Sequence, residues 1–126
     1  MFNQACEKDV WGACNNAGLL YQKGEKYLNV PKDIKRAIEC FSKACEGNFA
    51  NGCFNLSILY LTGHDGVAKD MGKALEYSVK SCKLGHSWGC VNASRMYSQG
   101  DGVEINKKMA EEFKKLAKVN SGKGWR

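Results

Sequence analysis

Apolar side chains recur every three or four residues along most of this chain, the spacing that gathers them on one side of a helix. The first such stripe begins near Ala13, and a second follows Asp33, a residue type that suits the N-cap position of a helix. Between Cys53 and Tyr60 the chain is apolar on almost every side, as expected for a helix that neighbours cover on both flanks. The pattern therefore predicts helices in pairs, joined by loops that contain glycine. The helices whose bounds the pattern defines best are residues 33–46, 89–99 and about 106–119.

The same order of residue types occurs three times along the chain. Two cysteines eight residues apart are followed by Asn, Tyr and Gly, and the copies start at Cys6, Cys45 and Cys82, which are 39 and then 37 residues apart. Self-similarity at such a period is typical of stacked repeats. We therefore expect an all-α fold, an α/α superhelix (solenoid) of about three helix pairs. The expected units are residues 1–8 as the end of a preceding repeat, 9–46, 47–83 and 84–119 as repeats with a final capping helix, and 120–126 as a flexible tail.

Composition places the chain among ordinary globular proteins. Of its 126 residues, 44% are hydrophobic and 25% are charged. The longest unbroken apolar run, Ile58–Leu61, is far shorter than a membrane span, so none is predicted. The net charge of +6 would suit a polyanion, but the basic residues are spread along the chain and mixed with acidic ones. We therefore expect no nucleic-acid partner. Protein partners are expected instead, and we expect the chain to be a monomer.

The paired cysteines are the most specific chemical feature of the sequence. Two residues eight apart on one continuous helix have Cα atoms about 12 Å apart, whereas a disulfide tolerates at most about 7 Å. A bridge therefore needs a chain reversal between the two cysteines, which Gly47 with Asn51-Gly52, and Gly85 with Gly89, are expected to supply. Disulfides here would tie the end of one unit to the start of the next; free buried thiols in a reducing compartment are the alternative. The expected bridges are Cys6–Cys14, Cys45–Cys53 and Cys82–Cys90.

Cys40 has no partner at this spacing, and it lies on a predicted buried stripe. We expect a free thiol that packs as a small core side chain, with a reactive or intermolecular role as the alternative. Structural zinc sites use close cysteine pairs with further Cys or His nearby, whereas the cysteine pairs here are eight residues apart and His64 and His86 have no such partner. No Cys-x-x-Cys redox motif occurs either. We therefore predict no metal site.

Catalytic motifs are absent from the sequence, so we do not expect an enzyme. It contains no Ser-x-x-Lys, no glycine-rich phosphate loop and no His-Glu-x-x-His. Stacked helix pairs instead offer a concave face on which repeated polar positions can hold a peptide. Asn16, Asn55 and Asn92 share one such position and Arg95 lies close by, which makes them candidate partner-binding residues. The alternative is that these asparagines satisfy backbone groups between the units.

Ala13-Cys14, Gly52-Cys53 and Gly89-Cys90 open copies of a pattern that continues with Asn, Tyr and Gly. The later copies then have Gly-Val, and the pattern ends with Asp33, Asp70 or Asn106. This pattern resembles the Sel1-like repeat family, which is TPR-like, and the cysteine pairs resemble its cysteine-rich branch. The segments Lys69-Asp70-Met, Leu84-Gly-His86 and Asn92-Ala-Ser-Arg-Met-Tyr97 are similar to the carboxyl-terminal part of the mitochondrial members that assist assembly of respiratory complex IV, cytochrome c oxidase.

The resemblance implies a non-enzymatic scaffold of the mitochondrial intermembrane space, oxidised there, whose partners are respiratory-complex subunits or other assembly factors. It implies two alternatives as well. One is a haem-binding or thiol-redox carrier in the same compartment, with His64, His86 and Met96 as candidate axial ligands, although no cofactor is required by any motif. The other is a secreted cysteine-rich repeat protein of the kind given a β-lactamase label.

Overall fold

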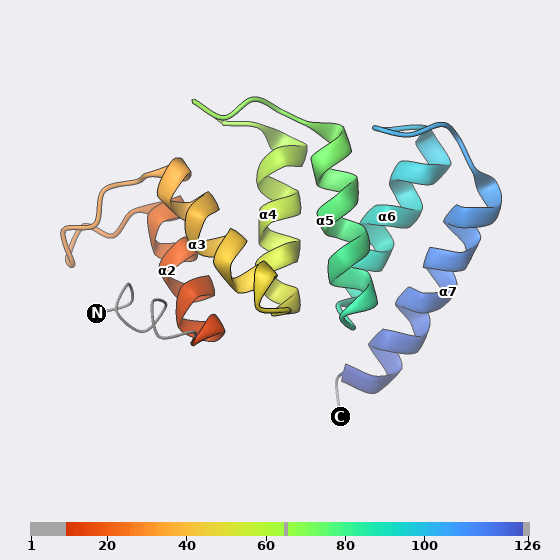
Figure 1. The fold of residues 1–126 in the computed structure, drawn as a ribbon, viewed down its shortest axis with the longest axis horizontal. Coiled ribbons are helices and arrows are strands. Elements are labelled where there is room, and N and C mark those ends of the chain that lie inside the picture. Colours follow the sequence, from red (N-terminus) through yellow and green to blue (C-terminus); the bar gives the residue numbers. More distant parts are fainter. Residues whose placement is uncertain (1–9, 65, 125–126) are drawn as a thin grey trace.

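A computed structural model describes residues 10–64 and 66–124, and these residues form six helices that stack side by side in chain order (Figure 1). Five of the helices have 13 residues and the last has 18. The all-α solenoid predicted from the repeat period is therefore confirmed. The helices are α2 (Trp11–Lys23), α3 (Ile34–Glu46), α4 (Ala50–Thr62), α5 (Met71–Lys83), α6 (Ser87–Gln99) and α7 (Lys107–Gly124).

Short side chains fix where the second helix of each pair begins. The carboxylate of Asp33 accepts a hydrogen bond from the backbone N–H of Arg36 at 3.1 Å, and Asp70 does the same for Lys73 at 3.0 Å. Asn106 accepts from Met109 at 3.0 Å, so a side-chain cap occupies the same place in all three pairs. Each bond satisfies one of the backbone donors that a helix leaves free in its first turn. The N-cap roles predicted for Asp33 and Asp70 are confirmed.

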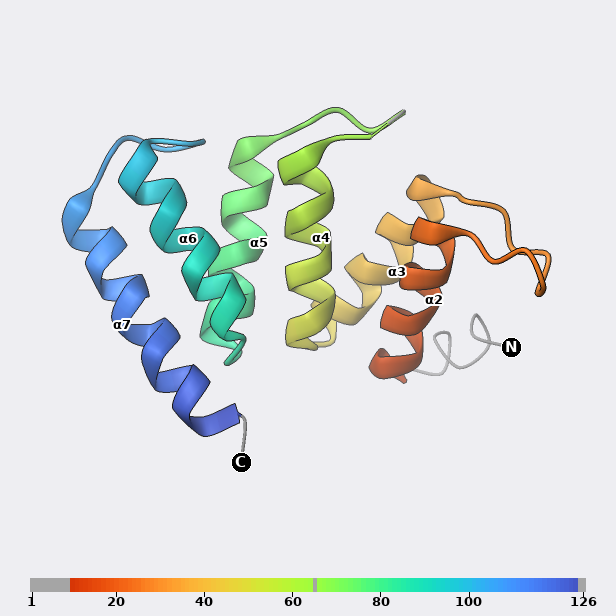
Figure 2. The ribbon, with the colours of Figure 1, turned by 180° about the vertical axis from the view of Figure 1, so that it is seen from behind.

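The helices pair as α2 with α3, α4 with α5 and α6 with α7, and the pairs are joined through contacts of α3 with α4 and of α5 with α6. Seen from behind, the first helices of the pairs, α2, α4 and α6, lie on one side of the stack, with α3 and α5 behind them (Figure 2). The chain thus presents two different faces. We call the side formed by α2, α4 and α6 the first-helix face, and the side formed by α3 and α5 the second-helix face.

The core lies between the two layers of helices and runs along the stack. Phe41, Leu56 and Leu59 are fully buried and form one cluster with Ala37 and Ile34. Further along, a second cluster is built around Ala93, Met96 and Phe113. Burying such side chains stabilises the fold by about 1.5–3 kcal/mol each. No helix in the described part of the chain is both long and apolar enough to span a membrane.

The carboxyl-terminal end differs from the prediction. A helix ending near Val119 with a flexible tail over 120–126 was expected, but α7 continues to Gly124. The side-chain amide of Asn120 donates to the backbone carbonyl of Cys82 at 3.2 Å and contacts the Cys90 sulfur at 3.3 Å, which anchors this part of α7 to the preceding pair. The first helix of the third unit also begins earlier than expected, at Ser87 rather than Gly89. The predicted repeat end over residues 1–8 lies outside the described residues.

Candidate functional site

The two junctions between helix pairs each contain a disulfide. Cys45 bonds to Cys53 with Cα atoms 4.6 Å apart, and Cys82 bonds to Cys90 with Cα atoms 4.5 Å apart. Both pairs were expected from their spacing. Each bridge ties the last turn of α3 or α5 to the first turn of the following helix, so the stack is covalently cross-linked at both junctions.

The chain reversal that permits these bridges comes only in part from the residues that we expected: Gly85 was predicted for the second turn, but Asn48 was not predicted for the first. Asn48 and Gly85 have left-handed backbone conformations, with φ of 63° and 101°, and they turn the chain between the helices. Asparagine and glycine are the residue types that tolerate this conformation best. Gly47 has an ordinary φ of −80°, and Gly52 and Gly89 lie inside helices. Gly47 lies in the first turn, as predicted, whereas the predicted turn role of Gly52 and Gly89 is wrong.

Gly52 and Gly89 instead allow the helices to touch. A Cβ atom at position 52 would lie only 2.6 Å from the Cβ atom of Ala44, and one at position 89 would lie 3.0 Å from the backbone nitrogen of Cys82. Neither position has room for a side chain. Small residues at these contacts let each new first helix approach closely enough for the neighbouring cysteines to bond.

The remaining cysteines differ from one another. Cys14 is fully buried and disulfide-bonded; its predicted partner Cys6 lies outside the described residues, so that pairing stays a prediction. Cys40 is a free cysteine and only 8% exposed. Burial, and secondarily the nearby Glu39 carboxylate, raise the pKa of the Cys40 thiol. Because the thiolate is the reactive form of cysteine, Cys40 is kept as an inert core side chain.

The asparagines predicted to line one surface have three different environments. The amide of Asn55 donates to the side-chain oxygen of Asn15 at 2.8 Å, which links α4 to α2 in the preceding pair. Asn16 is exposed, and so is Arg95. Asn16, Asn55 and Asn92 thus share a position on α2, α4 and α6, with Arg95 close by on α6, but they differ in exposure and in hydrogen bonding. Asn55 makes a bond between units, but to the side chain of Asn15, whereas the alternative to peptide binding was a bond to backbone groups.

Asn15 was missed by the sequence reasoning. It is only 7% exposed and is the partner of Asn55. The sequence could have indicated a contact for Asn15, because this residue directly follows the buried Cys14 on the side of α2 that faces the next pair. The corresponding residue in the second pair is Phe54, which cannot accept a hydrogen bond. The Nδ2 atom of Asn92, at the position of Asn55, is accordingly buried without a hydrogen-bond partner among the described residues.

The second junction holds an aromatic stack in place of the asparagine pair. The rings of Phe54 and His86 are nearly parallel, with centroids 4.5 Å apart. The Nδ1 atom of His86 is buried and has no hydrogen-bond partner within the described residues. Burial lowers the pKa of His86, because a charged imidazole would lose its hydration there. His86 therefore acts at this junction as a neutral packing residue.

The three candidate haem ligands occupy different parts of the fold. His64 lies in the loop after α4, where its Nε2 atom is 3.1 Å from the Thr62 hydroxyl. His86 directly precedes α6, and Met96 is buried ten residues further on, about 15 Å along a helix axis. His86 and Met96 are thus too far apart along α6 to bind one iron together. The described residues contain no group of three or more His, Cys, Asp or Glu side chains arranged to hold a metal ion.

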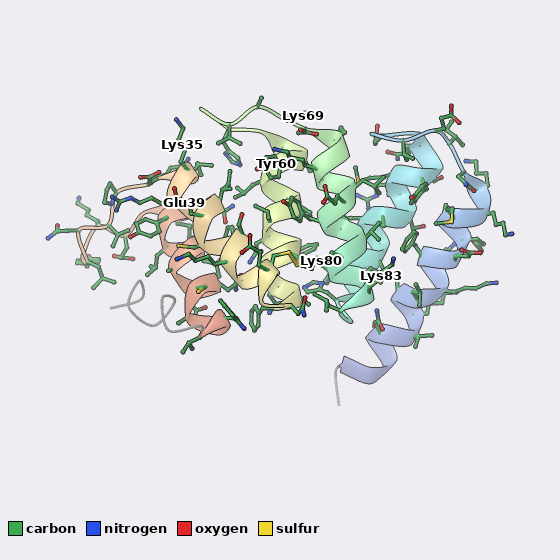
Figure 3. All side chains as sticks on the ribbon, viewed as in Figure 1. Lys35, Glu39, Tyr60, Lys69, Lys80 and Lys83 are labelled. Carbon is green, nitrogen blue, oxygen red and sulfur yellow. A yellow bond between two sulfur atoms is a disulfide. The ribbon has the colours of Figure 1, made fainter. Side chains whose placement is uncertain are left out.

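The two faces of the stack differ in charge. On the first-helix face, α4 has no charged residue, α2 has only Lys23 and α6 has only Arg95. The second-helix face carries charges of both signs, among them Lys35 and Glu39 on α3 and Lys80 and Lys83 on α5 (Figure 3). Cores of protein interfaces are depleted in charged residues. The first-helix face is therefore the better candidate for binding another protein.

The outward stripe of the first-helix face repeats in each pair, at spacings of three and four residues. It consists of Asn16, Leu19 and Lys23 on α2, Asn55, Ile58 and Thr62 on α4, and Asn92, Arg95 and Gln99 on α6. Leu19 is 40% exposed, and Ile58 is partly exposed. The stripe therefore combines amide, hydroxyl and aliphatic groups with only two charges.

The chain is similar to known proteins in both sequence and structure. A model of the family described as "Sel1 repeat" matches residues 11–49, 50–86 and 89–117. Proteins named cytochrome c oxidase assembly factor 7 are similar in sequence. That of Danio rerio is 53% identical over 84% of this chain and 46% of its own length, and that of Homo sapiens is 44% identical over 92% and 52%. The chain thus spans about half the length of the curated relatives it matches.

Solved structures show the same fold. A Sel1 repeat protein from Oxalobacter formigenes superposes with a TM-score of 0.82 and 29% identity, covering 90% of this chain and 45% of that one. Helicobacter pylori cysteine rich protein B superposes with a TM-score of 0.70 and 29% identity, covering 94% of this chain and 82% of that one. The stacking of helix pairs seen here is thus the arrangement found in these structures.

Proposed function

This chain belongs to the Sel1 repeat family, and we propose that it is a non-enzymatic protein-interaction scaffold that acts in the assembly of cytochrome c oxidase in the mitochondrial intermembrane space. Its partners are subunits or assembly factors of that complex, and they bind on the first-helix face. Asn16, Asn55, Asn92 and Arg95 contribute to this surface as parts of its outward stripe.

The observation that carries this proposal is the contrast between the two faces. A stripe with two charged residues in nine runs along three helices, while α3 and α5 carry mixed charges that suit solvent. A partner that covers the stripe desolvates few charges, which keeps the cost of binding low. Repetition of the stripe in successive pairs suits an extended partner that contacts several helices at once.

The relatives and the disulfides support the cellular setting. The relatives that are 44–53% identical bear the name cytochrome c oxidase assembly factor 7. Disulfides persist in oxidising compartments and are rare where thioredoxin and glutathione keep thiols reduced. Two bridges at the junctions of a small solenoid are therefore in keeping with the intermembrane space.

The test is complementation in mouse cells that lack their cytochrome c oxidase assembly factor 7. A hybrid in which this chain replaces the matching part of the mouse protein is expressed, and assembled complex IV is measured on native gels together with oxygen consumption. We expect the hybrid to restore both. A hybrid that restores complex IV no better than an empty vector would overturn the assembly role.

Variants of the hybrid test the binding face separately. Leu19→Glu and Ile58→Glu place a charge on the outward stripe and are expected to reduce assembled complex IV, since a partner would then bury an unpaired carboxylate. The matched control is Ile105→Glu, the same kind of change at a 61% exposed position outside the helices. The hybrid levels are checked by immunoblot. If Leu19→Glu performs as well as Ile105→Glu at equal abundance, the first-helix face is not the binding surface.

A further inference from the structure

The last helix pair carries an open groove, which we call the end groove, between the first half of α6 and the second half of α7. Its volume is about 590 Å³. Its lining includes the apolar residues Trp88 and Val91 of α6 and Ala117 of α7, together with Lys114 and Lys118 of α7. Trp88 is 58% exposed, whereas Ala117 is 7% exposed.

In the earlier pairs, the surface that corresponds to the end groove is covered by the next helix. Aligning the second helices of the three pairs places Ala117 at the position of Ala44 and Ser81, and Lys118 at the position of Cys45 and Cys82. In the first pair these positions are covered by α4, whose Gly52 touches Ala44. In the second they are covered by α6, whose Gly89 touches Ser81. The end groove is therefore the place where the first helix of a following pair would pack.

Two positions of the end groove carry lysine where the earlier pairs carry residues that the next helix covers. Phe41 and Ser78, which are buried under the next helix in the earlier pairs, correspond to Lys114. The two disulfide-bonded cysteines correspond to Lys118. Between residues 104 and 126 there are seven basic and three acidic residues, so this end of the chain is positively charged. A helix that packs here must therefore bring carboxylates to the places where α4 and α6 bring apolar or cysteine side chains.

We propose that the end groove binds a helix of a partner protein, docked as the first helix of a following repeat would dock. The partner helix has glycine or alanine against Ala117 and acidic residues facing Lys114 and Lys118. This surface is distinct from the first-helix face and does not depend on the assembly role. A second copy of this chain does not supply such a helix, because α2, α4 and α6 contain no acidic residue and the chain carries a net charge of +6.

The chain itself provides the template for a probe. Cys53 of α4 faces Cys45, and Leu56 packs in the same cluster as Phe41, so these two residues oppose the positions that correspond to Lys118 and Lys114. The probe is a fluorescein-labelled peptide with the sequence of Ala50–Thr62, carrying Cys53→Glu and Leu56→Glu and held helical by a lactam link on its outward side, because an isolated helix of this length is marginal in water. The control peptide has glutamine at both positions.

Binding of the peptide to the full chain is measured by fluorescence anisotropy. We expect the glutamate peptide to bind at least about tenfold more tightly than the glutamine peptide, and this preference to fade with added salt. The variant Lys114→Glu/Lys118→Glu should lose the preference, and a peptide with lysine at both positions should bind that variant instead. The matched variant Lys108→Glu/Lys115→Glu makes the same charge change at exposed positions of α7 outside the groove and should keep the preference.

Three results would overturn the proposal. Equal binding of the two peptides would remove the recognition of acidic residues. An equal loss of the glutamate preference in both double variants would mean that the net charge of the chain, and not the end groove, attracts the peptide. A dimer in sedimentation experiments that Lys114→Glu/Lys118→Glu dissociates would identify a second copy as the occupant. Leu19→Glu should leave peptide binding unchanged, so failure of the end groove and failure of the first-helix face are separate outcomes.

Discussion

The junction between α3 and α4 and the junction between α5 and α6 have the same covalent frame but different surroundings. In both, a disulfide between cysteines eight residues apart lies beside a glycine that touches the preceding helix. Around the first, Asn15 and Asn55 form a hydrogen bond between pairs. Around the second, Phe54 stacks on His86, and the Nδ2 atom of Asn92 is left without a partner in the described structure.

The comparison shows which features a repeat must keep and which it can exchange. The disulfide and the small residue set the distance between adjacent helices, so they recur at both junctions. The neighbouring positions can be filled by an amide pair, which also satisfies its polar atoms, or by an aromatic stack, which only fills the space. The aromatic stack leaves the Nδ2 atom of Asn92 and the Nδ1 atom of His86 without hydrogen-bond partners in the described structure, and its effect on stability can be measured.

The largest effect is expected from removing either disulfide. Cys45→Ser/Cys53→Ser and Cys82→Ser/Cys90→Ser should each lower the free energy of unfolding by about 2–3 kcal/mol, because both bridges close loops of the same short length. Urea denaturation of the oxidised proteins measures both changes. A difference between the two variants of more than about 1 kcal/mol would mean that the local surroundings, and not loop closure, set the contribution of the bridge.

Filling the close contacts should have the next largest effect. Gly52→Ala brings a methyl group against Ala44, and overpacking of this kind typically costs about 1–3 kcal/mol, which outweighs the better helix propensity of alanine. Ala44→Gly added to Gly52→Ala should recover part of the loss by making room. Thermal unfolding of the single and double variants gives the coupling between the two sites. Additive effects would show that the two residues are not in contact.

The asparagine positions should respond in opposite ways. Asn55→Ala leaves the buried side-chain oxygen of Asn15 without its donor and is expected to cost about 1–2 kcal/mol. Asn92→Ala removes an unsatisfied buried amide and should change stability by less than about 0.5 kcal/mol or raise it slightly. Urea denaturation of the two variants and the unchanged chain measures the free energy of unfolding in each case. Equal losses in the two variants would indicate that Asn92 has a partner in solution.

The smallest effect concerns pH and belongs to the second junction alone. Burial lowers the folded-state pKa of His86, so above the unfolded-state pKa of about 6.5 its stabilising contribution is fully present. As the pH falls below that value, the unfolded chain binds a proton more readily, and the folded state loses stability. His86→Phe, which keeps an aromatic ring against Phe54, should flatten the stability profile between pH 7.5 and 5. The matched variant His64→Gln should leave this dependence in place.

Much of the fold was predictable because it depends on periodic patterns. The repeat period gave the stacked helix pairs, and Asp33 and Asp70 marked helix starts through a local hydrogen bond that depends on few other residues. The two described disulfides followed from spacing and helix geometry. Details that depend on contacts between pairs were not predictable from spacing. The role of Gly52 and Gly89 comes from how closely two helices approach, and the helix end at Gly124 goes with a bond from Asn120 to a carbonyl 38 residues away.

The candidate site was predictable only in outline. Asn16, Asn55 and Asn92 do share a position in the repeat. The environments of Asn55 and Asn92, however, depend on the preceding first helix, which offers Asn15 to Asn55 and Phe54 to Asn92. The charge difference between the two faces could have been read from the sequence by comparing first helices with second helices. The end groove could not, because Lys114 and Lys118 resemble an ordinary solvated helix surface until their correspondence with covered positions is known.

The short separation of the bridged cysteines also affects how the chain reaches its folded state. A contact between residues eight apart forms within about 10–100 ns in an unfolded chain, so the native pairs meet far more often than Cys53 meets Cys82, 29 residues away. Cys40 is the exception, because it lies only five residues from Cys45. Once α3 forms, these two residues are about 7.5 Å apart along the helix axis alone, too far for a bond. A formed α3 therefore prevents Cys40 from pairing with Cys45 during oxidative folding.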